Sequence, residues 1–75
     1  MLELYILNGC PYCRKVMKYL DEHKIEYQTF DISDRENLEA LKRLGGIEQV
    51  PFLVDKTKKI ELYESNDILE YLKTL

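Results

Sequence analysis

Apolar residues follow one spacing in some stretches of the chain and another spacing in others, which predicts alternating strands and helices. Leu2 to Leu7 is almost continuously apolar and precedes Asn8-Gly9, so it predicts a short strand buried on both faces. From Pro11 to about His23, apolar residues recur at helical spacing and charged residues fill the opposite face. Glu26 to Ile32 predicts a second strand. The first half therefore has the order β-α-β.

The middle of the chain predicts a second helix. Ser33 and Glu36 have the spacing of a capping box, so we expect this helix to start at Asp34. Gly45-Gly46 is expected to end it, as glycines commonly end helices. Its predicted buried face consists of Leu38, Leu41 and Leu44.

The last third of the chain predicts a hairpin followed by a helix. Val50 to Asp55 is apolar, and Pro51 stands at its entrance, where a proline removes no central ladder hydrogen bond. A polar lysine-rich turn separates it from the returning strand, Ile60 to Tyr63. Ser65 is expected to be the N-cap of the last helix.

The complete pattern is β-α-β-α-β-β-α, which predicts an α/β fold. A strand–helix–strand unit places its two strands parallel, and a short hairpin places its strands antiparallel. We therefore expect a four-stranded mixed sheet flanked by three helices, and a single domain over residues 1–75.

Charge and composition exclude several functions. The chain of 75 residues has a net charge of −3 and a pI near 5.1, which gives no electrostatic footprint for nucleic acid. It shows no basic leader followed by an apolar run and no stretch long enough to cross a membrane, so we expect no membrane association. With only two cysteines, both in one motif, the chain does not resemble a secreted disulfide scaffold. We expect a cytoplasmic monomer.

That motif, Cys10-Pro11-Tyr12-Cys13, lies where the first helix is predicted to begin. Helical positions i and i+3 have Cβ atoms about 5–6 Å apart, so small adjustments reach disulfide geometry. Pro11 suits the first helical turn, where its missing N–H is not needed. Cys10 faces free N–H groups and the positive end of the helix dipole, which stabilise a thiolate more than a thiol. We interpret Cys10 as the nucleophile and Cys13 as the resolving thiol.

A zinc site is the competing interpretation of two closely spaced cysteines. Tetrahedral zinc needs four ligands, and beyond Cys10 and Cys13 the chain offers only His23 without recruiting carboxylates. His23 is better explained as a surface residue near a helix C-terminus. We therefore predict redox chemistry and no metal.

Three motifs together resemble the glutaredoxin family. Cys10-Pro11-Tyr12-Cys13 resembles the active-site motif of dithiol glutaredoxins. Val50-Pro51, about forty residues later, resembles the Val–cis-Pro pair that this family places beside its cysteines. Glu64-Ser65-Asn66-Asp67-Ile68 resembles the Glu-Ser-x-x-Ile pattern of glutathione-transferase N-terminal domains. The chain is most similar to the N-terminal domain of the larger, transferase-like glutaredoxins, without their second, all-helical domain.

The resemblance implies a thioredoxin-like fold and a glutathione-dependent thiol–disulfide oxidoreductase that acts on disulfide-bonded or glutathionylated proteins. Glutathione would be a co-substrate, with no bound cofactor. Cys10 and Cys13 would be catalytic, and the implied glutathione-binding residues are Tyr12, Val50, Pro51, Glu64, Ser65 and Asn66. The physical chemistry of a helix start agrees, because free N–H groups there bind a carboxylate.

One position departs from the family pattern. Many small glutaredoxins carry a lysine three residues before the first cysteine, where this chain has Leu7. This departure leaves open a glutaredoxin-like redoxin that thioredoxin reductase reduces, for example as electron donor to ribonucleotide reductase. A third alternative is a dimeric glutaredoxin that holds an iron–sulfur cluster through Cys10 and glutathione, although Pro11 is usually unfavourable for this in the family.

Overall fold

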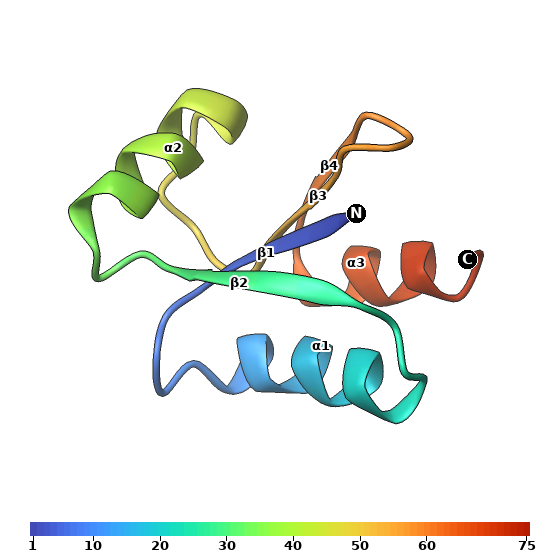
Figure 1. Cartoon of the computed structure of the whole chain (residues 1–75). Coiled ribbons are helices and arrows are strands. Elements are labelled where there is room, and N and C mark those ends of the chain that lie inside the picture. The colour runs from blue at the N-terminus through green and yellow to red at the C-terminus, as the bar shows by residue number, and fades with distance from the viewer.

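The seven predicted elements follow one another along the chain in the expected order. The computed structural model describes all 75 residues, and its elements are β1 (Leu2–Ile6), α1 (Pro11–Glu22), β2 (Tyr27–Asp31), α2 (Arg35–Gly45), β3 (Phe52–Asp55), β4 (Ile60–Tyr63) and α3 (Ser65–Leu72). The four strands form one sheet in the order β2-β1-β3-β4 (Figure 1). β1 runs parallel to β2 and antiparallel to β3, and β3 pairs antiparallel with β4. The mixed sheet is therefore confirmed.

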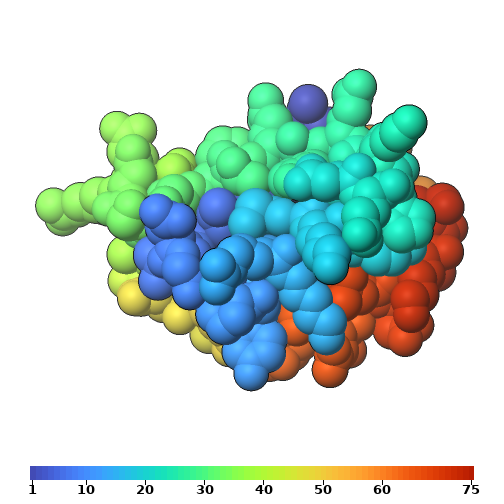
Figure 2. Space-filling view, turned by 90° about the horizontal axis from the view of Figure 1, so that it is seen from below, coloured from blue at the N-terminus to red at the C-terminus, as the bar shows by residue number.

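Helices cover both faces of this sheet. α1 and α3 lie on one face and α2 lies on the other (Figure 1). Seen from the side of the paired helices, α1 and α3 lie next to each other across the surface (Figure 2). The core between the sheet and these two helices is formed by Leu2, Leu4, Val16, Leu20, Leu53, Ile68 and Leu72. A smaller core under α2 is formed by Tyr5, Leu41, Phe52 and Val54.

The central strands carry most of the burial, as the apolar runs predict. Leu4 of β1 and Leu53 of β3 face each other in the sheet register and are fully buried. Complete burial of a leucine side chain contributes about 1.5–3 kcal/mol, so such pairs hold the middle of the sheet. The edge strands β2 and β4 are only partly buried. None of the helices has both the length and the apolar character needed to cross a membrane.

The predicted capping box of α2 is wrong by one residue. Asp34 is the N-cap, and its carboxylate accepts a hydrogen bond from the N–H of Glu36 at 2.9 Å. The N–H of Ser33 instead donates to the carboxylate of Asp31 at 2.8 Å. Asp34 is favoured over Ser33 as the N-cap because the helix dipole stabilises a charged carboxylate there, whereas serine offers a neutral hydroxyl. The helix ends at Gly46 with φ of 84°, as the glycine pair predicts.

Leu44 is the one member of the predicted inner face of α2 that is exposed, at 41% of its surface. Leu41 is fully buried and Leu38 is half-buried. One turn beyond Leu41, the side chain of Leu44 reaches only a shallow groove beside Val54 and Ile60. α2 therefore attaches to the sheet through Leu41, and its last turn lies at the margin of the core.

Candidate active site

The Cys-Pro-Tyr-Cys motif forms the start of α1. A turn at Asn8-Gly9 connects it to β1, and Gly9 adopts φ of 85°, which favours glycine. Cys10 is the N-cap of the helix, and its sulfur accepts a hydrogen bond from the N–H of Cys13 at 3.3 Å. The predicted position of Cys10 is therefore confirmed. An N–H that points at this sulfur stabilises negative charge there.

The two thiols differ in their surroundings. Cys10 is half-buried, whereas Cys13 is completely buried beneath the first turn of α1. Burial, and after it the hydrogen bond with Cys10, together raise the pKa of the Cys13 thiol to about 12. Cys13 is therefore a neutral thiol near pH 7. The accessible thiol is Cys10, as a nucleophile has to be.

A cavity of about 460 Å³ borders the motif. It is lined by Tyr12, Gln49, Val50, Pro51, Glu64, Ser65 and Asn66. Its volume is within the range of small-molecule sites. Tyr12 forms the edge shared with the motif, and neither cysteine lines the cavity itself. The structure thus brings together all six residues for which the resemblance implied glutathione binding. The Val50–Pro51 peptide bond is cis, in agreement with the same resemblance.

The start of α3 differs from the prediction. Glu64 occupies the N-cap position with φ of 67°, and no side chain caps the helix. Ser65 is the first helical residue and is buried, with 8% of its surface exposed. Ser65 is displaced from the cap because β4 runs directly into the helix, and the sharp turn needed there falls at Glu64. The first N–H groups of α3 consequently have no side-chain capping bond, and Ser65 at this helix start lines the cavity.

Gln49 is a site residue that the sequence analysis did not single out. Its side-chain Nε2 donates a hydrogen bond to Oε1 of Glu64 at 3.1 Å, so it joins the two walls of the cavity. The available signal was its place directly before Val50-Pro51. Its partner is 15 residues away along the chain, and no local spacing pattern points to it.

Leu7 lies between β1 and the motif, and 43% of its surface is exposed. Its carbonyl accepts a hydrogen bond from the N–H of Cys10 at 3.1 Å. An apolar side chain is therefore exposed three residues before Cys10, and its backbone contacts the backbone of Cys10. His23 lies at the opposite end of α1, exposed and stacked on Tyr19 with ring centroids 4.0 Å apart. It is a surface residue, as predicted.

Comparison with known proteins identifies the family. Residues 4–75 match the glutathione S-transferase N-terminal domain family. Mouse prostaglandin E synthase 2 is 32% identical over an alignment of 75 positions, which covers 97% of this chain and 19% of that protein. The chain thus spans about a fifth of that relative, and at most half of the other curated relatives it matches.

Two solved structures extend the comparison. The thioredoxin-like protein BC3987 has a TM-score of 0.85 at 21% identity and is covered over 97% of its length, which shows the fold. Glutaredoxin 2 of Salmonella typhimurium, solved in complex with glutathione, has a TM-score of 0.81 at 26% identity over 96% of this chain and 32% of that protein. The chain therefore belongs to the glutathione S-transferase N-terminal domain family and has the thioredoxin-like fold.

Proposed function

We propose that this protein is a glutathione-dependent thiol–disulfide oxidoreductase of the glutaredoxin type. The observation that carries the proposal is the pairing of an accessible Cys10 with a buried Cys13, directly beside a cavity lined by Val50 and Ser65. A family whose name refers to glutathione, and a structural neighbour that contains it, support glutathione as the co-substrate. The dithiol mechanism and the residue roles are part of the proposal.

The first step is attack by the Cys10 thiolate on a glutathionylated protein. Its sulfur bonds to the glutathione sulfur, and the protein's own sulfur leaves as a thiolate that takes up a proton. The N–H of Cys13 stabilises the attacking thiolate. A second glutathione, as thiolate, then attacks the glutathionyl–Cys10 disulfide. Oxidised glutathione leaves and the Cys10 thiolate is regenerated, so one free glutathione is oxidised for each protein thiol released, and it leaves joined to the glutathione that came from the substrate.

A protein disulfide needs the second cysteine. Cys10 attacks one sulfur of the substrate and forms a mixed disulfide, while the other substrate sulfur leaves as a thiolate. Cys13 loses its proton and attacks the Cys10 sulfur, which releases the second substrate thiol and leaves a Cys10–Cys13 disulfide. Two molecules of glutathione then reduce this disulfide and become oxidised glutathione. A buried thiol near Cys10 suits this intramolecular step, since it does not compete for external substrates.

The cavity supplies complementary groups for the two ends of a γ-glutamyl-cysteinyl unit. We assign the N–H groups and hydroxyl at Ser65 to the ligand carboxylate, with Asn66 nearby, and the carboxylate of Glu64 to the ligand ammonium. The backbone of Val50, beside Pro51, would pair with the cysteinyl unit as a short added strand. Tyr12 would flank the ligand where the cavity meets the motif.

The exposed side chain of Leu7 favours a second candidate. An apolar residue beside Cys10 suits contact with a protein surface, so thioredoxin reductase in place of glutathione could supply the electrons. Either donor fits a reducing compartment, and we propose that the protein acts in the cytoplasm as a monomer, with no resident cofactor.

Trapping the intermediate tests the proposal. The Cys13→Ser variant is incubated with a glutathionylated peptide without free glutathione, and the protein is examined by mass spectrometry. We expect one glutathione on Cys10 and stoichiometric release of the free peptide thiol. Attachment of the peptide to Cys10, with release of glutathione, would contradict glutathione recognition by the cavity.

A further inference from the structure

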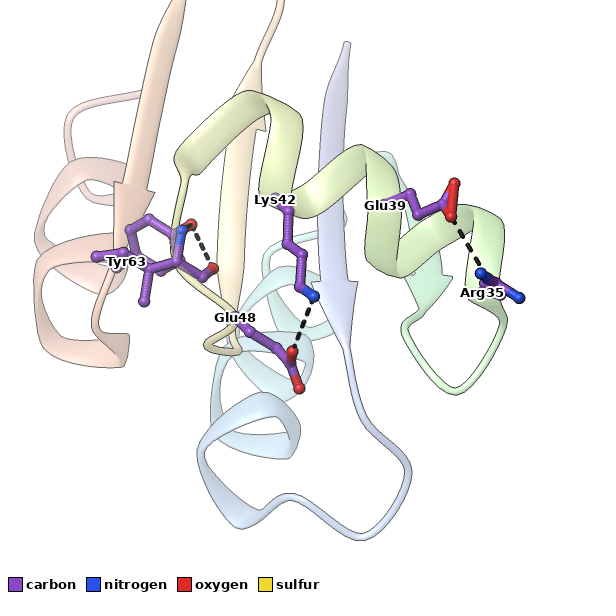
Figure 3. Close-up of polar contacts among 6 residues, drawn as sticks. Arg35, Glu39, Lys42, Glu48 and Tyr63 are labelled. Carbon is purple, nitrogen blue, oxygen red and sulfur yellow. Dashed lines mark hydrogen bonds and ion pairs between the residues drawn. The ribbon is translucent and has the colours of Figure 1, made fainter.

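The segment Gly46–Gln49 links α2 to the cavity and has no regular secondary structure. It is held by the hydroxyl of Tyr63, the last residue of β4. Tyr63 Oη donates a hydrogen bond to the carbonyl of Ile47 at 2.7 Å and accepts one from the N–H of Ile47 at 3.2 Å (Figure 3). Both polar backbone groups of Ile47 are thus satisfied by one side chain from a distant strand.

This contact depends on a close approach at Gly45. A Cβ placed on Gly45 would overlap Tyr63 Oη, so any larger residue would displace the ring. Gly45 is helical and has no positive φ, so its need for glycine comes from this approach. On its other side the ring packs on Phe52, with centroids 4.5 Å apart. The Tyr63 side chain is therefore held at its hydroxyl by Ile47 and at its ring by Phe52.

Tyr63 also neighbours both walls of the cavity, although it does not line the cavity itself. Along the chain it immediately precedes Glu64 and Ser65, which form one wall. Across the sheet it is the register partner of Phe52, which directly follows Pro51 of the other wall. Its hydroxyl then reaches the segment that leads into Val50. The Tyr63 side chain therefore contacts the chain on both sides of Val50-Pro51, at Ile47 before it and at Phe52 after it.

Other ties on this segment are weaker. Lys42 and Glu48 form an ion pair at 3.4 Å, but both side chains are more than half exposed, and such pairs contribute little (Figure 3). The hydrogen bond between Gln49 and Glu64 joins two flexible side chains, whereas the bonds to Ile47, although they also lie at the surface, come from a ring that packs on Phe52. The backbone hydrogen bonds to Tyr63 are the ones anchored by a packed ring.

We propose that Tyr63 is a positioning residue of the site. Its hydroxyl sets the position of the Val50 backbone relative to Ser65, so that both can engage one ligand. This inference rests on the proposed glutathione function. Tyr63 would contact no reacting atom, and its effect would appear in binding of the glutathionyl group rather than in the sulfur exchange at Cys10.

The test compares Tyr63→Phe with Tyr27→Phe as matched control. Tyr63→Phe keeps the ring on Phe52 and removes both hydrogen bonds to Ile47. Tyr27→Phe removes the hydroxyl of another half-buried tyrosine, which donates to Asp21 at 2.9 Å outside the cavity. With a glutathionylated peptide and saturating glutathione, we expect Tyr63→Phe to raise KM about five- to tenfold and to change kcat less than about twofold. Tyr27→Phe should change neither.

Hydrogen exchange gives a readout that does not depend on activity. The amide of Ile47 should lose protection in Tyr63→Phe and keep it in Tyr27→Phe. Gly45→Ala, which forces the ring away, should reproduce the higher KM. Lost protection of Ile47 with an unchanged KM would overturn the inference, and so would an equal rise in KM in both tyrosine variants. A wild-type protein that glutathione does not reduce would instead refute the proposed function, and this inference with it.

Discussion

The backbone N–H of Cys13 donates a hydrogen bond to the sulfur of Cys10, 3.3 Å away. The two residues are in direct contact but differ in accessibility, because the first turn of the helix leaves the Cys10 sulfur partly exposed and buries the Cys13 sulfur. The N–H that contacts the Cys10 sulfur belongs to the backbone of Cys13 and does not depend on its side chain. The side chain of Cys13 is needed for a different step.

Exchanging each cysteine for serine should separate these parts. Cys10→Ser is expected to abolish reduction of every substrate, since the attacking sulfur is gone. Cys13→Ser should keep or improve release of glutathione from proteins, because the N–H of residue 13 remains, and should lose reduction of protein disulfides. Steady-state assays with both substrate types measure this. Residual turnover of Cys10→Ser above a few per cent of wild type would refute the nucleophile assignment.

The buried Cys13 predicts a pH dependence for the resolving step. Burial holds the pKa of its thiol at about 12, so its thiolate fraction should increase about tenfold for each pH unit below that value. Release of product from a mixed disulfide at Cys10 should therefore become faster from pH 6 to pH 9. Stopped-flow measurement of this single step gives the profile. A rate that levels off near neutral pH would show that Cys13 ionises far more easily than its burial implies.

Ser65 and Asp34 predict opposite outcomes for two substitutions at helix starts. Ser65 makes no capping bond, so Ser65→Ala should change the free energy of unfolding by less than about 0.5 kcal/mol while raising KM for glutathionylated substrates. Asp34 does cap α2, so Asp34→Ala should cost about 1 kcal/mol and leave KM unchanged. Urea unfolding and steady-state kinetics on both variants decide the matter. Destabilisation by Ser65→Ala with an unchanged KM would reduce Ser65 to a structural role.

The hydrogen bond from Tyr71 to Asp55 predicts how stability depends on pH. Asp55 is buried, with 4% of its surface exposed, and the Tyr71 hydroxyl holds the pKa of its carboxyl below the usual range. A lowered pKa in the folded state contributes stability that is complete above the unfolded value of about 3.9 and is lost as pH falls through the lower, folded value.

Tyr71→Phe should therefore lower the free energy of unfolding at pH 7 by about 1–2 kcal/mol and by less at pH 3. Tyr27→Phe serves as control, because its hydroxyl bonds to an exposed carboxylate, and it should cost less than about 0.5 kcal/mol. Urea unfolding at the two pH values measures both. An equal loss at pH 7 and pH 3 would mean that the bond to Asp55 is not what stabilises the fold.

Hydrophobic spacing predicts the fold because it reports which residues each element buries. Leu4, Leu20 and Leu41 are each fully buried on the faces that the spacing assigns. Spacing is less informative at element ends, where one residue decides which side chain caps. The capping residues predicted for α2 and α3 are each one position off, and Leu44, which the spacing predicts to be buried, is exposed.

The residues of the candidate site also differ in how well the sequence predicts them. Its members that lie in short motifs, such as Cys10 and Ser65, are recognisable from neighbouring residues. Gln49 and Tyr63 are not, because their hydrogen-bond partners lie 15 and 16 residues away and depend on how the strands register. From sequence, a single tyrosine in a half-buried strand is ordinarily explained by packing. Only the structure shows that the Tyr63 hydroxyl approaches Gly45 and the backbone beyond it.

The most direct test of the central claim is the rate at which the protein reduces a glutathionylated peptide with two alternative electron supplies. One is glutathione with glutathione reductase and NADPH, and the other is thioredoxin reductase with NADPH. The account predicts fast turnover with glutathione that survives Cys13→Ser and slow turnover with thioredoxin reductase. Fast turnover with thioredoxin reductase and none with glutathione would contradict it, and would identify the exposed Leu7 beside Cys10 as the feature that sets the partner.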